Sequence, residues 1–358
     1  MRPLHSGICP TCDVPAIWAK DSVLDGDNTS LQRMVPIRGV FYEAGEIEHF
    51  IRGMEGSLGA SLDRVVFAAH KRAVRRFFKG ALRGLTGSLA RAVAPAFIYR
   101  QQAKVAPDFG MGRMGIVGYE RGGPLEVEAT NVWDEGLFAA DVAGAFEAVE
   151  GTECDVDTGK ADGTYRFTAR KSGEERLEYT GRLIPLTGAL SRERAHPRCH
   201  ACGAPVSFQV FYWDHELGEI RERENGLRVV HRTAGCFDSM LREMEIELGG
   251  ELRELAVRAQ ADYVRDKVAS GAYGPGEPLD DTGRRYFHYL GLIRRRCMGN
   301  PVNFDFSTWD LRVSIRNPAN EELLIGRVLG TYEAVTGKEG RAAGASSGGM
   351  LKVEVSSA

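Results

Sequence analysis

The segment LEVEATNVWDEGLFAADVAGAFEAVEGTE, residues 125–153, is matched by a second segment, LRVSIRNPANEELLIGRVLGTYEAVTGKE, residues 311–339. The two segments align without a gap at a shift of 186 positions and share 12 identities in 29. Self-similarity at a fixed shift indicates an internal repeat, and an internal repeat changes how every other motif is interpreted. The match therefore predicts that the chain contains the same structural unit twice.

A second match extends the repeat toward the N-terminus. Residues 9–60 align with residues 199–250 at a shift of 190 and share 13 identities in 52. The change of shift between the two matches places a small length difference in the middle of the unit, where loop lengths vary most freely. We predict a tandem duplication: a first unit at residues 1–180, a linker rich in Gly, Pro and charge at residues 181–198, and a second unit at residues 199–358.

Length and composition agree with two folded units. The chain has 358 residues, 27% charged and 43% hydrophobic, with a formal net charge of −3, which is typical of globular proteins. No uninterrupted apolar run of about 18 residues occurs, and the N-terminus lacks the apolar core of a signal peptide. We therefore expect a cytoplasmic protein without a membrane span. The near-neutral charge makes a nucleic-acid partner unexpected.

The sequences of the two units predict the same order of helices and strands. Cys-x-x-Cys turns open both units, and the apolar run 206–213 predicts a strand in the second. Helical periodicity follows at 47–57 and 237–247, and residues 113–120 with 124–132 predict a hairpin. Helices at 139–149 and 325–335 carry Gly144 and Gly330 at mid-helix, which indicates close packing there. With closing strands at 164–170 and 349–355, the predicted class is α+β with an antiparallel sheet in each of two pseudo-symmetric units.

The spacing G-x-x-x-G-x-x-E-x-x-x-G-K at residues 326–338, with a copy around Gly144, Glu147 and Gly151, resembles the C-terminal part of the 4-vinyl reductase domain family. The resemblance implies an α+β domain with a cavity between a helical layer and the sheet. It also implies a ligand such as a hydrocarbon or a tetrapyrrole-like molecule, bound in a sensory or accessory protein. Of the paired cysteines that this family carries in its closing hairpin, only Cys154 stands near the corresponding place.

The cysteines carry the most specific chemical signal. CPTC (9–12) and CHAC (199–202) have the form of zinc knuckles, in which a tight turn aims two thiolates at one ion. One alternative is a single four-thiolate site of Cys9, Cys12, Cys199 and Cys202 shared by both units. A second is one site per unit, completed in unit two by His215, His231 or Cys236. The third alternative is that these cysteines are reduced thiols without a metal.

Two further clusters are candidate ligand-binding residues. The helix His70–Arg83 places basic side chains, Arg72 among them, around one apolar face and could hold an acidic ligand, although a solvated helix face is the plainer interpretation. In unit two, His288 and Tyr289 belong to an aromatic run followed by arginines and Cys297. Core packing of the aromatic side chains is the plainer interpretation there.

The absence of nucleotide-binding and hydrolase motifs leaves three hypotheses for function. The first is a sensory or accessory protein that binds a small apolar molecule and has structural zinc at the knuckles. The second is an enzyme that acts on an apolar or tetrapyrrole-like substrate in a cavity of one unit. The third is a zinc-stabilised nucleic-acid-binding regulator. The duplication makes a pseudo-dimer within one chain, and the oligomeric state is left open.

Overall fold

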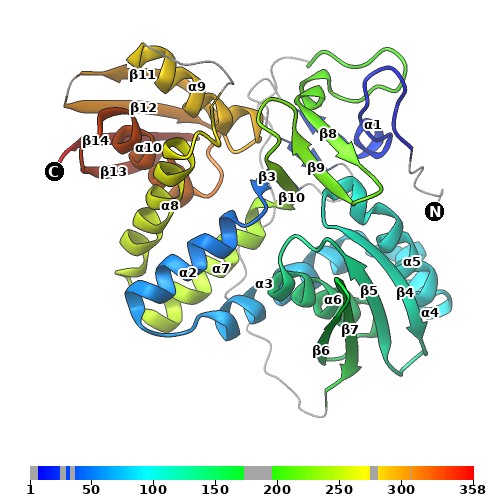
Figure 1. The fold of residues 1–358 in the computed structure, drawn as a ribbon. Coiled ribbons are helices and arrows are strands. Elements are labelled where there is room, and N and C mark those ends of the chain that lie inside the picture. The colour runs from blue at the N-terminus through cyan, green and yellow to red at the C-terminus, as the bar shows by residue number, and fades with distance from the viewer. Residues whose placement is uncertain (1–6, 25–29, 33–36, 173–195, 275–280, 308) are drawn as a thin grey trace.

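The protein has an α+β fold, as the sequence predicts, and the described residues form three antiparallel sheets (Figure 1). The computed structural model describes residues 7–24, 30–32, 37–172, 196–274, 281–307 and 309–358. The helices of the described residues are α1 (Ile17–Asp21), α2 (Glu46–Leu58), α3 (Asp63–Ala81), α4 (Gly84–Val93), α5 (Pro95–Val105), α6 (Glu135–Glu150), α7 (Ala234–Leu248), α8 (Leu252–Ala269), α9 (Thr282–Arg295) and α10 (Glu321–Thr336). Two short 3₁₀ helices, Ala106–Phe109 and Val206–Val210, complete the helical elements described.

The central sheet is built from both halves of the chain. Its strand order is β1 (Ser22–Leu24), β2 (Ser30–Gln32), β3 (Ile37–Glu43), β10 (Arg228–Thr233), β9 (Glu219–Glu222) and β8 (Phe211–Asp214). The two halves meet at the antiparallel pair β3–β10, in which Phe41 lies opposite His231. These two residues are also 190 positions apart, the shift of the N-terminal sequence match.

Two four-stranded sheets lie apart from each other in Figure 1, and they have the same topology. One has the order β4 (Arg113–Tyr119), β5 (Leu125–Thr130), β7 (Thr164–Lys171) and β6 (Cys154–Ala161). The other has the order β11 (Asn300–Phe306), β12 (Asp310–Arg316), β14 (Met350–Ser357) and β13 (Gly340–Ser347). Helix α6 packs against β6 and β7, and α10 packs against β13 and β14. We call the first sheet with α3, α5 and α6 the first lobe, and the second sheet with α8, α9 and α10 the second lobe.

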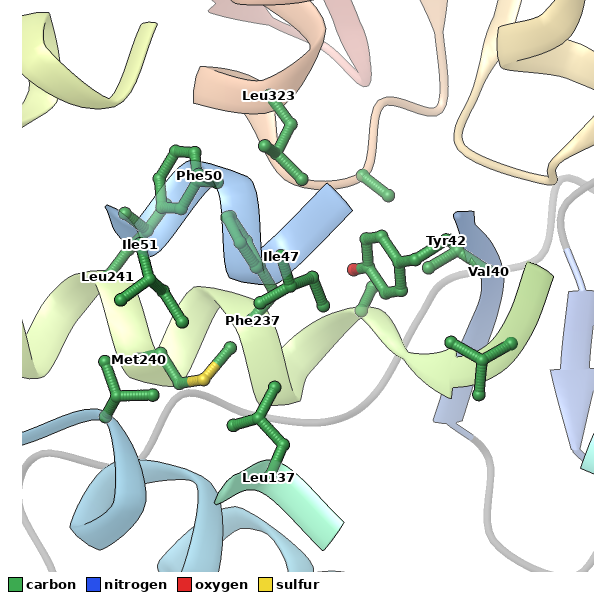
Figure 2. Close-up of a cluster of buried hydrophobic side chains, with 14 of the residues drawn as sticks. Val40, Tyr42, Ile47, Phe50, Ile51, Leu137, Phe237, Met240, Leu241 and Leu323 are labelled. Atoms are coloured by element: carbon green, nitrogen blue, oxygen red, sulfur yellow. The ribbon is translucent and has the colours of Figure 1, made fainter. Parts of the chain in front are cut away.

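Helices α2 and α7 connect the two lobes. Helix α2 packs against α8 of the second lobe, and α7 packs against α3 of the first, so each half of the sequence contributes a helix to the lobe of the other half. Figure 2 shows side chains of α2 and α7, such as Phe50 and Phe237, gathered in one cluster with Leu137 of α6 and Leu323 of α10. Phe50 and Phe237 meet edge to face at 5.1 Å between ring centroids. One continuous core therefore spans both lobes.

The predicted strand 206–213 is wrong in its first half. Residues Val206–Val210 form a 3₁₀ helix, and β8 begins only at Phe211. Residues three apart lie on the same side of a 3₁₀ helix, so Phe208 and Phe211 both enter the core, which alternation along a strand would not allow. Residues 181–195 of the predicted linker lie outside the described residues. Within the described part of the chain, no helix is both long and apolar enough to cross a membrane.

The mid-helix glycines lie where two helices meet. A Cβ added at Gly144 of α6 would come within 2.6 Å of the carbonyl oxygen of Lys71 in α3. A Cβ added at Gly330 of α10 would collide with the carbonyl oxygen of Ala261 in α8. The close packing that the sequence predicts at both glycines is confirmed.

We expect Gly144→Ala and Gly330→Ala each to lower the free energy of unfolding by about 1–3 kcal/mol, because the added methyl group must displace backbone of the facing helix. Gly291→Ala in α9 is the matched control, since a Cβ there meets nothing within 4 Å. It should be neutral or raise the free energy by up to about 1 kcal/mol through helix propensity. Urea unfolding measures all three, and equal effects at the three positions would contradict the close approach.

Candidate metal centre and ligand cavity

Four cysteines from the two Cys-x-x-Cys turns form one cluster. The sulfur atoms of Cys9, Cys12, Cys199 and Cys202 all lie within 4.8 Å of one another. The closest hydrogen-bonded pair, Cys12 and Cys202, has its sulfurs 3.5 Å apart. Around a tetrahedral zinc ion with Zn–S bonds of about 2.3 Å, sulfur atoms would be roughly 3.8 Å apart. The structure therefore brings both turns together at a place where the donor set and spacing suit a metal ion.

Both turns have the same backbone geometry. The amide of Cys9 donates to the carbonyl of Val14 at 3.1 Å, and the amide of Cys199 donates to the carbonyl of Ala204 at 2.8 Å. Each hydrogen bond closes a loop that points both thiols of the turn to the same side. The equivalent bonds in the two turns explain how two separate segments can supply matching halves of one site.

The electrostatics differ between the first and second cysteine of each turn. The backbone N–H of Thr11 donates to the Cys9 sulfur and lowers the pKa of that thiol to about 6. The N–H of Cys202 similarly lowers the pKa of Cys199. Burial instead raises the pKa of the Cys12 and Cys202 thiols. A bound cation would favour the thiolate form of all four and so overcome the effect of burial.

The other metal ligands considered from the sequence lie elsewhere. His215 places its Nε2 atom 3.0 Å from a carboxylate oxygen of Asp108. The Cys236 sulfur lies 2.8 Å from the hydroxyl of Thr233, and His231 lies among aromatic rings. None of the three belongs to the group of metal-ligand side chains found in the described residues. Their positions do not support one separate site per unit.

The first lobe contains a cavity of about 210 Å³ that is partly open to solvent. It lies between α3, α5, α6 and the strands β4 and β5, and α1, β10 and α7 close one end. Most of its wall is apolar and comes from Ile17, Trp18, Val74, Phe77, Phe78, Ala81, Tyr99, Val105, Ala106, Phe109, Met111, Met114, Ile116, Leu125, Val127, Phe138, Val142 and Ala145. The cavity lies between helical layer and sheet, where the family resemblance places a ligand.

His231 is the distinctive polar group of the cavity wall. Its ring lies edge to face with Trp18, 4.6 Å between centroids, and with Phe41, at 4.9 Å. Neither ring nitrogen has a hydrogen-bond partner, although the side chain is buried. Burial, and secondarily the charge of Arg232, lowers the pKa of His231 to about 3, so the ring is neutral at pH 7. Gly39 on the neighbouring strand makes room, because a Cβ there would overlap the imidazole.

An ion pair lies beside His231. Arg232 and Asp141 both line the cavity and pair with each other. His70 places its Nε2 atom 3.0 Å from Asp141 and 2.9 Å from the Arg232 guanidinium. Burial alone would raise the pKa of Asp141, but the charge of Arg232, together with the contact to His70, holds it below its usual value. The pair is therefore ionised with no net charge.

The candidate ligand-binding residues fall in three different places. His70 supports the polar end of the cavity through Asp141 without itself lining it. Arg72 pairs with Glu243 of α7 at 2.8 Å. His288 and Tyr289 lie on α9 in the second lobe, where His288 bonds the carbonyl of Tyr273 at 2.7 Å. The structure does not bring these four residues together.

The middle of the basic face of α3 is not the solvated face that the sequence indicates, although Lys79 near the end of the helix is exposed. Lys71 is buried and places its Nζ atom 2.6 Å from Glu147, and Arg75 lies 2.6 Å from Glu153. With Arg72 paired to α7, these charges bind α3 to its neighbours. They are therefore not available to a phosphate or an acidic ligand.

The second lobe has a different set of side chains at the matching positions. The sequence shifts pair His70 with Gln260, Asp141 with Arg327, Arg232 with Tyr42, and Cys236 with Glu46. Gln260 donates to the Glu46 carboxylate at 2.8 Å, and Arg327 pairs with the same carboxylate. Buried hydrogen bonds thus occupy this part of the second lobe.

A larger buried network lies next to these residues. Arg296, which is 0% exposed, pairs with Glu43 and places its Nε atom 2.7 Å from Glu222. The hydroxyl groups of Tyr263, at 2.8 Å, and Tyr273 also donate to Glu43. Burial would raise the pKa of Glu43 and of Glu222, but the charge of Arg296 outweighs it and lowers both.

Sequence reasoning treated His231 only as a metal ligand, and the cavity that the family resemblance implies was assigned neither to the first lobe nor to these lining residues. One sequence signal could have indicated a special role for His231, namely its alignment with Phe41 at the shift of 190. A histidine in one copy at a position that is phenylalanine in the other marks a difference between the two units. In comparisons with known proteins, no family model, curated protein or solved structure matches the chain. The relation to the 4-vinyl reductase domain family stays a prediction.

We expect Arg296→Met to lower the free energy of unfolding at pH 7 by about 3–5 kcal/mol, because it leaves two buried carboxylates without their cation. Arg312→Met is the control, since Arg312 and its partner Glu354 are both exposed, 3.8 Å apart. That change should stay within about 0.5 kcal/mol.

The pH dependence has a defined sign. Glu43 and Glu222 have lowered pKa values when folded, so their contribution to wild-type stability is present above about pH 4.5 and is lost as the pH falls below it. In Arg296→Met, burial without the cation raises both pKa values, so the deficit should shrink as acid protonates the carboxyl groups. Urea unfolding between pH 4 and 8 measures this, and a deficit independent of pH would contradict the assignment.

Proposed function

We propose that the protein is a sensory or accessory protein that binds a small, mostly apolar molecule in the cavity of the first lobe. The observation that carries the proposal is a mostly apolar cavity with one buried, unpartnered imidazole in its wall. Ligand sites commonly combine an apolar wall with a few polar groups that orient the ligand. The cavity of the first lobe offers this combination.

The volume of the cavity limits the size of its ligand. An engineered protein cavity of about 150 Å³ holds benzene. At about 210 Å³ the cavity here suits a molecule of one or two rings, or an aliphatic molecule of similar size. A tetrapyrrole, the larger class that the family resemblance implies, exceeds this volume. The size therefore favours the smaller hydrocarbon class.

The polar end favours an uncharged ligand with a hydrogen-bonding group. A neutral imidazole has one N–H donor and one acceptor nitrogen, so His231 can bind a hydroxyl group in either sense. Arg232 is already paired with Asp141, so an anionic ligand would find its charge neutralised. A small aromatic alcohol fits these requirements better than an aromatic acid.

Unequal divergence of two copies supports this proposal. We propose that the halves arose by tandem duplication of one unit, related to the 4-vinyl reductase domain. The equal strand orders of the two lobes and the pairing of Phe41 with His231 agree with a two-fold relation. One copy then keeps a cavity, and the other carries a buried network of charges at the matching positions.

For the four thiols we propose one structural zinc ion. Thiolates are soft donors that suit zinc, and four protein ligands complete a tetrahedral shell with no open position for substrate. Cys9, Cys12, Cys199 and Cys202 would hold this ion and tie the N-terminal turn to the second half of the chain.

Catalysis in the same cavity is less well supported. An acid or base has to exchange protons near the working pH. The pKa of His231 is about 3, and burial raises the pKa of Cys236 above its ordinary value. Both groups are therefore uncharged near pH 7, and the cavity residues serve binding better than proton transfer.

We expect one zinc ion per chain. Cys9→Ser and Cys199→Ser should each abolish stoichiometric binding, because the two turns share the ion. Cys154→Ser is the control, since Cys154 lies outside the cluster with its sulfur 3.5 Å from the carbonyl of Ala143. Elemental analysis of zinc-equilibrated, dialysed protein measures this. Two ions per chain, or one retained in both cluster variants, would refute the shared site.

We expect the protein to bind 1-naphthol more tightly than naphthalene, because only the hydroxyl group can pair with His231. His231→Phe keeps a ring of similar size and should reduce this preference by about 5- to 10-fold, the loss of one hydrogen bond. His288→Phe is the matched control, because His288 lies on α9 in the second lobe, away from the cavity.

Isothermal titration calorimetry of both compounds measures these affinities. A cavity-filling variant, Ala145→Phe, should weaken the binding of both compounds. If neither compound binds the wild-type protein, or if Ala145→Phe leaves both affinities unchanged, the cavity is not the site and the proposed function is wrong.

A further inference from the structure

Helix α1 belongs to both candidate sites. It begins five residues after Cys12, and its first two residues, Ile17 and Trp18, line the cavity. Cys9, Cys12 and Cys199 are members of the same apolar cluster as Ile17 and Trp18. One short segment, α1 with the cysteine loop before it, therefore contributes both to the thiol cluster and to the cavity wall.

Trp18 makes the contact that matters for the ligand. Its ring is 2% exposed and lies against His231, with centroids 4.6 Å apart, and against Phe109, at 5.2 Å. Phe208 stands six positions after Cys202, just as Trp18 stands six positions after Cys12. The rings of Phe208 and Trp18 pack edge to face, with their centroids 5.3 Å apart. Trp18 thus contacts the segment that follows the second Cys-x-x-Cys turn as well as the cavity wall.

Helix α1 has little stability of its own. It has five residues and no side-chain cap at its N-terminus, and isolated helices of this length do not persist in water. Its first turn is attached to the cysteine loop, where the amide of Ala16 donates to the carbonyl of Gly7 at 2.8 Å. The loop in turn meets the second Cys-x-x-Cys turn through the four sulfur atoms.

We propose that occupation of the four thiols by a metal ion and occupation of the cavity by a ligand are thermodynamically coupled through α1. A metal ion that fixes the two turns also fixes Trp18 against His231 and completes the cavity wall. A ligand packed on Trp18 holds α1, and with it Cys9 and Cys12, in the geometry that the metal ion requires. This inference rests on the proposed function of the cavity and adds that its affinity responds to the metal.

Coupling between two binding sites is reciprocal, so the ligand must raise the affinity for the metal by the same factor as the metal raises the affinity for the ligand. We expect a factor of about 5- to 150-fold, the range typical of coupled sites. The test is the zinc affinity of the full chain, measured by competition with a chromophoric chelator, with and without saturating 1-naphthol. This measurement does not require the metal-free protein to be isolated.

Trp18→Ala should abolish the increase in zinc affinity, because it removes the side chain that joins the two sites. Phe287→Ala, at an exposed position on α9, is the control and should retain it. If 1-naphthol binds the zinc-loaded protein but leaves the zinc affinity unchanged, the coupling is refuted while the proposed function stands. If 1-naphthol does not bind at all, the proposed function fails and the coupling fails with it. Coupling that persists in Trp18→Ala would also refute the role of α1.

Discussion

The antiparallel pairing of β3 with β10 is the constraint on which the rest of the structure depends. Its register sets Phe41 opposite His231 and joins the two halves of the chain in one sheet. Side chains alternate between the faces of a strand, so these two rings lie on the side of the cysteines while Val40, Tyr42 and Val230 enter the core beside α2 and α7. A slip of one residue would exchange the two faces. The thiol cluster and the cavity both depend on this register.

A buried histidine at the centre of this sheet is costly. An imidazole without hydrogen-bond partners in an apolar environment costs about 1–3 kcal/mol, and here Gly39 is also required to make room for it. Phe41, at the corresponding position of the other half, packs without such a penalty. Local choices that reduce stability tend to occur where a protein binds or reacts. The asymmetry between Phe41 and His231 therefore distinguishes the two halves of the chain in structure, even though the strand orders of the two lobes are equal.

Much of the local structure could be predicted from the sequence, because it depends on local patterns. The helices around Gly144 and Gly330 and the hairpin of β4 and β5 follow from periodicity and turn residues, and repetition gave each of them independent support. The shared thiol cluster was one of three alternatives, because spacing shows a pair of ligands but not where the second pair lies. The packing of α2 and α7 on the lobe of the other half could not be predicted, because the apolar faces of these helices could pack equally well against either lobe. A cavity between helical layer and sheet was expected from the family resemblance, but which lobe holds it and which residues line it could not be predicted, because a void leaves no sequence pattern of its own.

The two lobes also differ in the unfavourable free-energy terms of their interiors and in what offsets those terms. In the second lobe, Arg296 compensates Glu43 and Glu222, so burial of charge is balanced by ion pairs and tyrosine hydroxyl groups. In the first lobe, the cavity wall is mostly apolar and partly open to solvent, and apolar surface left in contact with water costs about 25 cal/mol per Å² relative to burial. The unpartnered imidazole of His231 adds a cost of about 1–3 kcal/mol. A ligand that fills the space and pairs with His231 recovers part of both costs, so the same defect that lowers the stability of the free protein provides the driving force for binding.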